Sequence, residues 1–132
     1  MENREIVSIK TAKMLKDAGY DGFSYDYIKG KSDKICHSNI EDCFNNRIDD
    51  DYVAIPSFYS VQAWLRIKYG IHIDISVGFP YDFGQCYFYF VYVVKDDHIE
   101  YPMDSDVLCS NSYEDTLENA IVYTIENLEI FT

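Results

Sequence analysis

The stretch from Ala54 to Val94 constrains the fold most, because it holds one capped helix followed directly by two apolar strands. Pro56 favours an extended conformation for the residue before it, and Ser57 is a typical N-cap. Gly70 is typical of the left-handed residue that follows a helix. The stretch therefore predicts a helix between Ser57 and Gly70.

This helix has two apolar sides. Four apolar or aromatic residues share one side: Phe58, Val61, Leu65 and Tyr69. Trp64 and Ile67 fall well away from them at 100° per residue, which gives a second apolar patch. We therefore expect that one layer of sheet does not bury the whole helix.

The two strands differ in pattern. Residues Ile71 to Phe79 alternate apolar and polar side chains, which predicts a strand with one buried face. Residues Cys86 to Val94 are apolar on both sides, which predicts a central strand covered on both faces. Pro80 and Gly84 in the link favour an antiparallel hairpin, and a third strand from His98 to Tyr101 follows at an edge.

The remaining elements complete an α+β fold. A first helix is expected from Ile9 to Ala18, and a last helix from Ser112 to Ile130. Phe23 to Ile28 and Ile35 to His37 suggest a hairpin, and the polar tract 39–51 suggests a loop.

We therefore predict a single domain over residues 1–132, in which one antiparallel sheet packs against helices. The element order is α, β-hairpin, α, three antiparallel strands, α. Residues 20–53 are the part whose structure the sequence leaves most open.

Charge and composition exclude some classes of protein. Hydrophobic residues make up 48% of the chain, so a disordered chain is excluded, and the net charge is −12. Residues 71–132 hold one Lys or Arg against twelve Asp or Glu, which would repel a phosphate backbone. Nucleic-acid binding would have to use the lysines of the N-terminal part, namely Lys10, Lys13, Lys16, Lys29, Lys31 and Lys34.

Localisation is predicted from missing signals. The chain shows no signal-peptide pattern and no run of ~18 apolar residues, so we expect a cytoplasmic protein. The four cysteines, Cys36, Cys43, Cys86 and Cys109, show no Cys-x-x-Cys spacing and are expected to be reduced thiols. Cys36, His37 and Cys43 fit no common zinc pattern, so neither a metal nor a cofactor is expected.

Six side chains form a candidate binding face on the predicted sheet: His72, Asp74, Tyr87, Tyr89, His98 and Glu100. On one surface they could bind a ligand or a metal, or transfer protons. A shift of one residue in register moves a side chain to the opposite face, so the hypothesis depends on strand pairing. The alternative is a partly solvated sheet face with no site.

The last predicted helix carries a second candidate. Asp115, Glu118, Glu126 and Glu129 face away from its apolar stripe and form an acidic ridge. Such a ridge suggests a DNA mimic that inhibits a nucleic-acid-binding protein of a host. Solubility alone also explains charge of this kind.

Three motifs together resemble a known group of proteins: IVSIKTAKMLKDAGY (residues 6–20), AIPSFYSVQAWLR (54–66) and SYEDTLENAI (112–121). They are similar to small uncharacterised proteins encoded by phages, prophages and mobile elements of Bacteroides-type gut bacteria. The resemblance implies a mobile-element context, hence a host cytoplasm, and it implies no activity. Phe58 and Tyr59 stand where small or polar residues are usual in that group.

No catalytic motif is present in the sequence, which favours a non-enzymatic accessory protein that binds another protein. Apolar surface on the helix and on the second strand motivates this hypothesis, and a homodimer is one form of it. The alternatives are the DNA mimic and a small enzyme or ligand-binding domain that uses the six-residue face.

Overall fold

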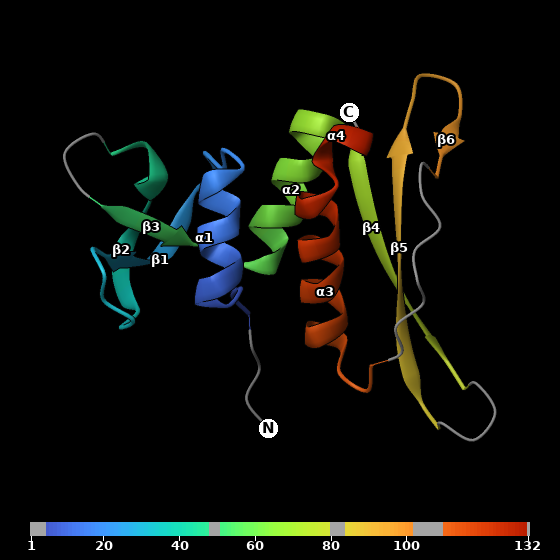
Figure 1. Ribbon diagram of the computed structural model, residues 1–132, viewed down its shortest axis with the longest axis horizontal. Coiled ribbons are helices and arrows are strands. Elements are labelled where there is room, and N and C mark those ends of the chain that lie inside the picture. Colours follow the sequence, from blue (N-terminus) through green and yellow to red (C-terminus); the bar gives the residue numbers. More distant parts are fainter. Residues whose placement is uncertain (1–4, 48–50, 80–83, 102–109, 132) are drawn as a thin grey trace. The chain divides into compact units, whose positions relative to one another are not determined.

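A computed structural model describes residues 5–47, 51–79, 84–101 and 110–131 (Figure 1). The fold is α+β, and the chain divides into two compact units, residues 1–64 and 65–132. Each unit has its own three-stranded antiparallel sheet. The prediction of one sheet is therefore wrong, whereas the prediction of a single domain stays a prediction.

The N-terminal unit pairs its strands in the order β2-β1-β3. Its elements are α1 (Ile9–Asp17), β1 (Ser24–Lys29), β2 (Cys36–Asp42), the 3-10 helix η1 (Phe44–Asn46), β3 (Tyr52–Ile55) and the start of α2 (Phe58–Tyr69). The predicted first helix and hairpin are confirmed. Ser8 caps α1 by accepting a hydrogen bond from the Thr11 amide at 3.2 Å, and α1 packs on β3.

The prediction of a loop over 39–51 is wrong in its described part. β2 continues to Asp42, η1 follows, and β3 begins at Tyr52. Asn45 holds this segment in place: its Oδ1 accepts a hydrogen bond from the Ala54 amide at 2.9 Å, and its Nδ2 donates one to the Tyr20 carbonyl at 3.0 Å. The polar residues thus carry tertiary contacts, a role that local composition does not reveal.

Aromatic rings also hold this part together. The ring of Phe44 stacks on Tyr27 with centroids 4.4 Å apart, and Tyr27 meets Tyr52 at 5.3 Å. Phe44 is buried, so a short polar tract still contributes a core residue. Residues 48–50 of the predicted loop lie outside the described residues.

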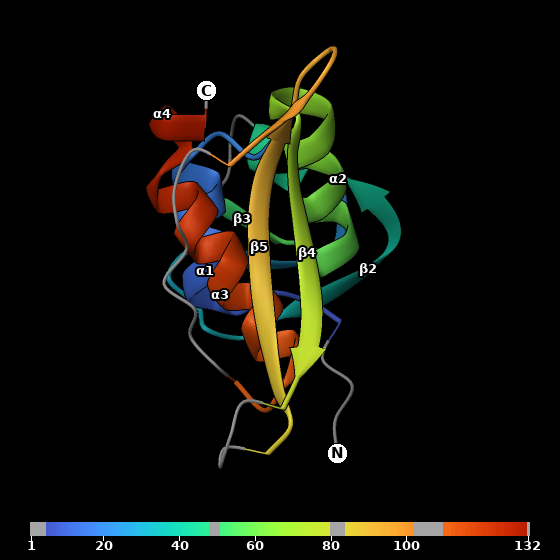
Figure 2. The same ribbon diagram turned by 90° about the vertical axis from the view of Figure 1, so that its right-hand side faces the viewer.

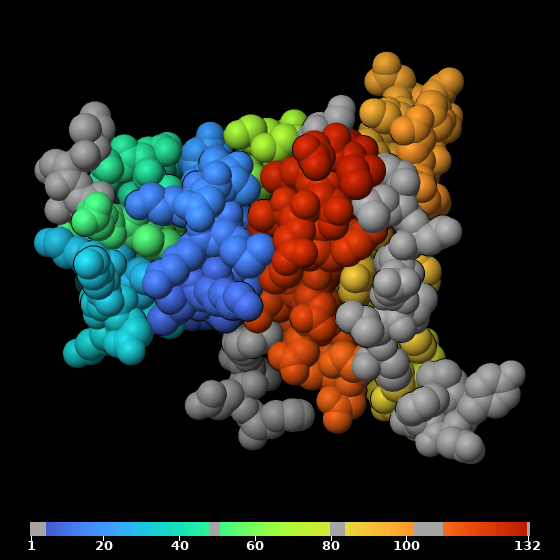
Figure 3. Space-filling model, in the orientation of Figure 1, coloured from blue at the N-terminus to red at the C-terminus, as the bar shows by residue number. Residues whose placement is uncertain are grey.

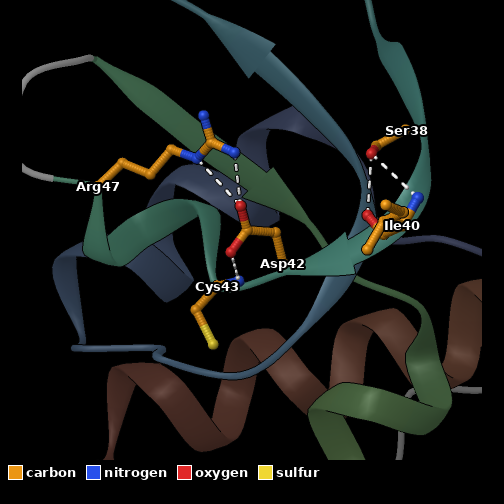
Figure 4. A network of polar contacts seen from close by, with 5 residues as sticks. All are labelled: Ser38, Ile40, Asp42, Cys43 and Arg47. Atoms are coloured by element: carbon orange, nitrogen blue, oxygen red, sulfur yellow. Dashed lines mark hydrogen bonds and ion pairs between the residues drawn. The ribbon is translucent and has the colours of Figure 1, made fainter.

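A bulge interrupts the pairing of β1 with β2. Ser24 lies opposite Asp42 and Asp26 lies opposite His37, so residues 38–41 face Tyr25 alone. The Ser38 hydroxyl donates to the Ile40 carbonyl at 2.8 Å and accepts from the Ile40 amide at 3.2 Å (Figure 4).

The end of β2 is fixed by a carboxylate. Asp42 accepts a hydrogen bond from the Cys43 amide at 2.8 Å and from Nε of Arg47 at 3.1 Å (Figure 4). The hydrogen bond from Arg47 holds the pKa of Asp42 below its ordinary value. The bulge and this pair give β2 a defined bend and a defined end.

The predicted limits of the central helix are confirmed. The Ser57 hydroxyl accepts a hydrogen bond from the Ser60 amide at 3.1 Å, and Gly70 has a φ of +70°. Of the second apolar patch, Trp64 is buried, and its indole nitrogen donates to Asp21 at 2.9 Å. Ile67 is 86% exposed.

The C-terminal unit pairs its strands in the order β4-β5-β6 (Figure 1). Its elements after α2 are β4 (Ile71–Gly78), β5 (Cys86–Val94), β6 (Ile99–Glu100), α3 (Tyr113–Glu126) and α4 (Leu128–Phe131). α3 packs on one face of the sheet, where the Tyr123 ring meets Tyr89 at 5.8 Å. Buried residues of the sheet and of α3 form the core between them: Ile71, Ile73, Val91, Val93, Leu117, Ala120 and Ile121.

Two predictions about this unit need correction. β5 is central, as predicted, but it is not covered on both faces, because Phe90 is 42% exposed. The last helix is not continuous from Ser112 to Ile130, because it breaks at Asn127. The Asn127 side chain donates a hydrogen bond to the Tyr123 carbonyl at 2.8 Å, a local interaction that competes with helix continuation.

The cysteines are in two states. Cys36 and Cys43 are free thiols, as expected, but Cys86 is disulfide-bonded, so the expectation of a reduced thiol is wrong there. Cys109 lies outside the described residues. In the parts of the chain that the structure describes, no helix has the length and apolarity needed to cross a membrane.

Asn45→Ala is expected to destabilise the protein by about 1–3 kcal/mol, because the Ala54 amide and the Tyr20 carbonyl each lose a hydrogen-bond partner. Chemical denaturation monitored by circular dichroism measures the change. Asn46→Ala is the matched control, since Asn46 is exposed, and it should change the free energy of unfolding by less than about 0.5 kcal/mol. Equal effects of the two substitutions would contradict the role of Asn45.

Candidate functional site

The face of the C-terminal sheet away from α3 is the candidate site. Strand pairing places Asp74 opposite Phe90, His72 opposite Tyr92 and Val94 opposite Ile99. Residues directly opposite in an antiparallel pair point to the same side. The open sheet face thus consists of His72, Asp74 and Ser76 from β4, Phe88, Phe90, Tyr92 and Val94 from β5, and Ile99 from β6.

The open sheet face combines an aromatic stripe, formed by Phe88, Phe90 and Tyr92 of β5, with polar side chains on β4. Tyr92 donates a hydrogen bond from its hydroxyl to Oδ2 of Asp74 at 2.9 Å, and its ring stacks on His72 with centroids 5.4 Å apart. Tyr101 meets the same ring at 5.6 Å. Partial burial, followed by the hydrogen bond to Asp74, raises the pKa of Tyr92 above its ordinary value.

Much of this face is exposed to solvent. Phe90 is 42% exposed, Val94 43% and Ile99 53%. Figure 2 looks onto β4 and β5 from this side, and α3 lies behind them. β5, whose two sides are both apolar, therefore buries one side against α3 and leaves the other side partly exposed to solvent.

The structure does not bring the six predicted face residues together. His72 and Asp74 lie on the open sheet face, but Tyr87 lies opposite Val77 and Tyr89 opposite Ile75, on the face toward α3. The single-surface arrangement is wrong for a simple reason. Directly paired residues share a face, and the tyrosines pair with the apolar set of β4 instead of its polar set.

The two remaining residues form a separate cluster at the turn between β5 and β6, which lies at the surface (Figure 3). Glu100 lies opposite Val93, whose side chain is buried. Nδ1 of His98 lies within hydrogen-bond distance of Oδ1 of Asp97, and Nε2 lies 2.9 Å from Oε1 of Glu100, so the protonated ring donates to both carboxylates. Hydrogen bonds to Asp97 and then Glu100 raise the pKa of His98 above its ordinary value.

The predicted acidic ridge is divided. Asp115, Glu118 and Glu126 lie on α3, and Glu129 lies on α4, beyond the break at Asn127. Asp115 and Glu118 each interact with a neighbouring group. The four carboxylates thus do not form one row along a single helix.

Sequence reasoning missed the aromatic members of the open sheet face. Phe88, Phe90 and Tyr92 alternate along β5, but the other side of the strand is equally apolar, so nothing local indicates which side meets a helix. Among the described residues, no group of three or more His, Cys, Asp or Glu side chains is arranged to hold a metal ion.

Comparisons with known proteins give no match: no protein-family model, no curated protein and no solved structure is similar to this chain. The resemblance to proteins of phages and mobile elements therefore stays a prediction.

The two carboxylates beside His98 give a titration test. Asp97→Asn is expected to lower the pKa of His98, because it removes the largest interaction that favours the protonated ring. Since the pKa is raised in the folded state, the cluster stabilises the protein below the unfolded pKa of about 6.5 and loses this contribution as pH rises through the folded pKa.

The measurement is an NMR titration of the His98 ring protons. Asp96→Asn is the control, because this neighbouring carboxylate makes no hydrogen bond to His98. If both substitutions shift the pKa of His98 equally, general charge and not the hydrogen bond raises it.

Proposed function

We propose that this protein is a non-enzymatic binding module whose open sheet face docks another protein. The observation that carries the proposal is the aromatic stripe of Phe88, Phe90 and Tyr92 on that face, in which Phe90 is exposed and the other two rings are half-buried although β5 is the central strand. Contiguous exposed apolar surface on a small protein is typical of an interaction site. Tyr and Phe are also enriched at the centres of interfaces.

The geometry of the face supports binding of a flat or extended apolar surface. The stripe is bordered on β4 by Asp74 and Ser76, which are exposed polar groups suited to the rim of an interface. The hydrogen bond from Tyr92 to Asp74 restricts both side chains before a partner arrives, which lowers the entropy lost on binding.

Charge favours a basic partner over a second copy. Residues 71–132 have a net charge of −11, so two copies that met through this face would repel each other. A partner with an apolar patch and a Lys- or Arg-rich rim would instead be attracted. We therefore propose a foreign, basic protein as the partner and treat the predicted homodimer as the competing outcome.

The setting is part of the same proposal. The resemblance of three motifs to proteins of phages and mobile elements supports an accessory protein that acts in the cytoplasm of a bacterial host. The disulfide bond of Cys86 weighs against that compartment, since disulfides persist mainly in oxidising environments.

Selection from a random peptide display library tests the docking face. Peptides that combine Lys or Arg with apolar residues are expected to bind the wild-type protein, with affinities that fall as salt is raised. Phe90→Asp should weaken their binding at least about tenfold, because it places a charge in the centre of the stripe. Titration calorimetry with the selected peptides measures the change.

Ile67→Asp is the matched control, because it adds the same charge at an exposed apolar residue on α2 and should leave binding unchanged. Circular dichroism verifies that both variants fold. Peptides that bind both variants equally would refute the docking face. Light scattering that shows a dimer which Phe90→Asp dissociates would assign the face to a second copy and refute the foreign partner.

A further inference from the structure

The N-terminal unit contains a pocket of about 400 Å³, within the size range of small-molecule sites. Its walls come from four parts of the unit: the segment before α1, the bulged hairpin of β1 and β2, the end of β3, and the start of α2. The lining residues are Glu5, Ile6, Ser24, Tyr25, Asp26, His37, Glu41, Ile55, Ser57, Tyr59 and Ser60.

Backbone contacts build this pocket. The Glu5 carbonyl accepts a hydrogen bond from the Phe58 amide at 3.0 Å, and Ile6 forms a bridge with Ser57, so the leading segment is attached to the start of α2. On the other side, the bulge at residues 38–41 carries Glu41 to the pocket, opposite Tyr25. The bulge is fixed by the Ser38 hydroxyl, as Figure 4 shows.

The charges of the lining are strongly one-sided. Three carboxylates line the pocket, from Glu5, Asp26 and Glu41, and no Lys or Arg is among the described residues that line it. His37 is the one basic group among the lining residues that the structure describes, and its Nδ1 already lies 2.8 Å from Oδ1 of Asp26. The pocket is therefore suited to a positively charged guest.

Two aromatic rings complete the arrangement. Tyr25 and Tyr59 belong to the lining, and Tyr59 is 74% exposed. A cation over the face of a tyrosine ring is stabilised by the ring quadrupole. Carboxylates together with tyrosine rings recognise an organic cation, whose charge pairs with the acids and whose stem covers the rings.

We propose that this pocket binds an ammonium or guanidinium group carried on an apolar stem. Such a group occurs in free amines and in lysine and arginine side chains, and the two sources share the chemistry. The site lies in residues 1–64 and does not depend on the open sheet face, so each proposal can fail without the other.

NMR titration of the ¹⁵N-labelled full chain tests the site. One arm uses butylammonium and propylguanidine, which carry stems as long as the side chains of lysine and arginine, and the other uses N-acetyl-lysine methylamide and N-acetyl-arginine methylamide. Saturable shifts at the amides of Tyr25, Asp26, Glu41 and Tyr59 are expected. Tighter binding of the blocked residues would identify the ligand as a side chain of a peptide, and equal binding would identify it as a free cation.

Variants separate the pocket from general acidity. Glu41→Gln and Tyr59→Ala should each weaken binding about two- to fivefold, through the lost charge and the lost ring. Both residues are exposed, so the unfolding midpoint should hardly change. Asp33→Asn is the control, because Asp33 is an exposed carboxylate outside the lining, and it should bind as the wild type does. Absence of saturable shifts, or shifts equally sensitive to Asp33→Asn, would overturn the proposal.

Discussion

A three-stranded sheet has two faces, and a single helix packed on it can cover only one of them. This constraint shapes the C-terminal unit. α3 covers one face of the β4–β5–β6 sheet with Leu117, Ala120 and Ile121, and the aromatic stripe of β5 remains on the other. The proposed function follows from this imbalance between the apolar surface that β5 carries and the cover that its own unit supplies.

The N-terminal unit solves the same problem differently. Its sheet is short, and irregular segments supplement the helix. Phe44 of η1 stacks on Tyr27 of β1, and Asn45 joins β3 to Tyr20, in the segment that follows α1, through two hydrogen bonds. Irregular backbone also leaves room between elements. The pocket lies beside the bulge between β1 and β2, so the feature that interrupts the sheet also forms one wall of the proposed site.

Much of the fold could be predicted because caps and periodicity are local. Ser8, Ser57 and Ser112 each cap the helix expected from the sequence, and β4 and β5 pair as the hairpin that their patterns indicate. β3 was missed because its four residues merge with the start of α2 and its neighbours are polar. Its burial depends on α1 and η1, which are distant in sequence.

The candidate site was harder to predict, because it depends on relations between strands. Alternation shows that His72 and Asp74 share a side, but it does not show which side of β5 joins them. Both sides of β5 are apolar, so only the position of α3 distinguishes Tyr89, which is buried, from Phe90, which is not. The pocket could not be predicted from the sequence either, since its carboxylates belong to Glu5, Asp26 and Glu41, which are far apart along the chain.

The open sheet face also has a colloidal consequence. At neutral pH the charge of −12 keeps copies of the chain apart in solution, although each exposes an aromatic stripe. Near the isoelectric point of about 4.4 this repulsion vanishes while the apolar surface remains. The acidity that suits a basic partner thus also prevents self-association of the protein. Self-association near the isoelectric point sets the lower limit of the pH range in which the face stays free to bind a partner.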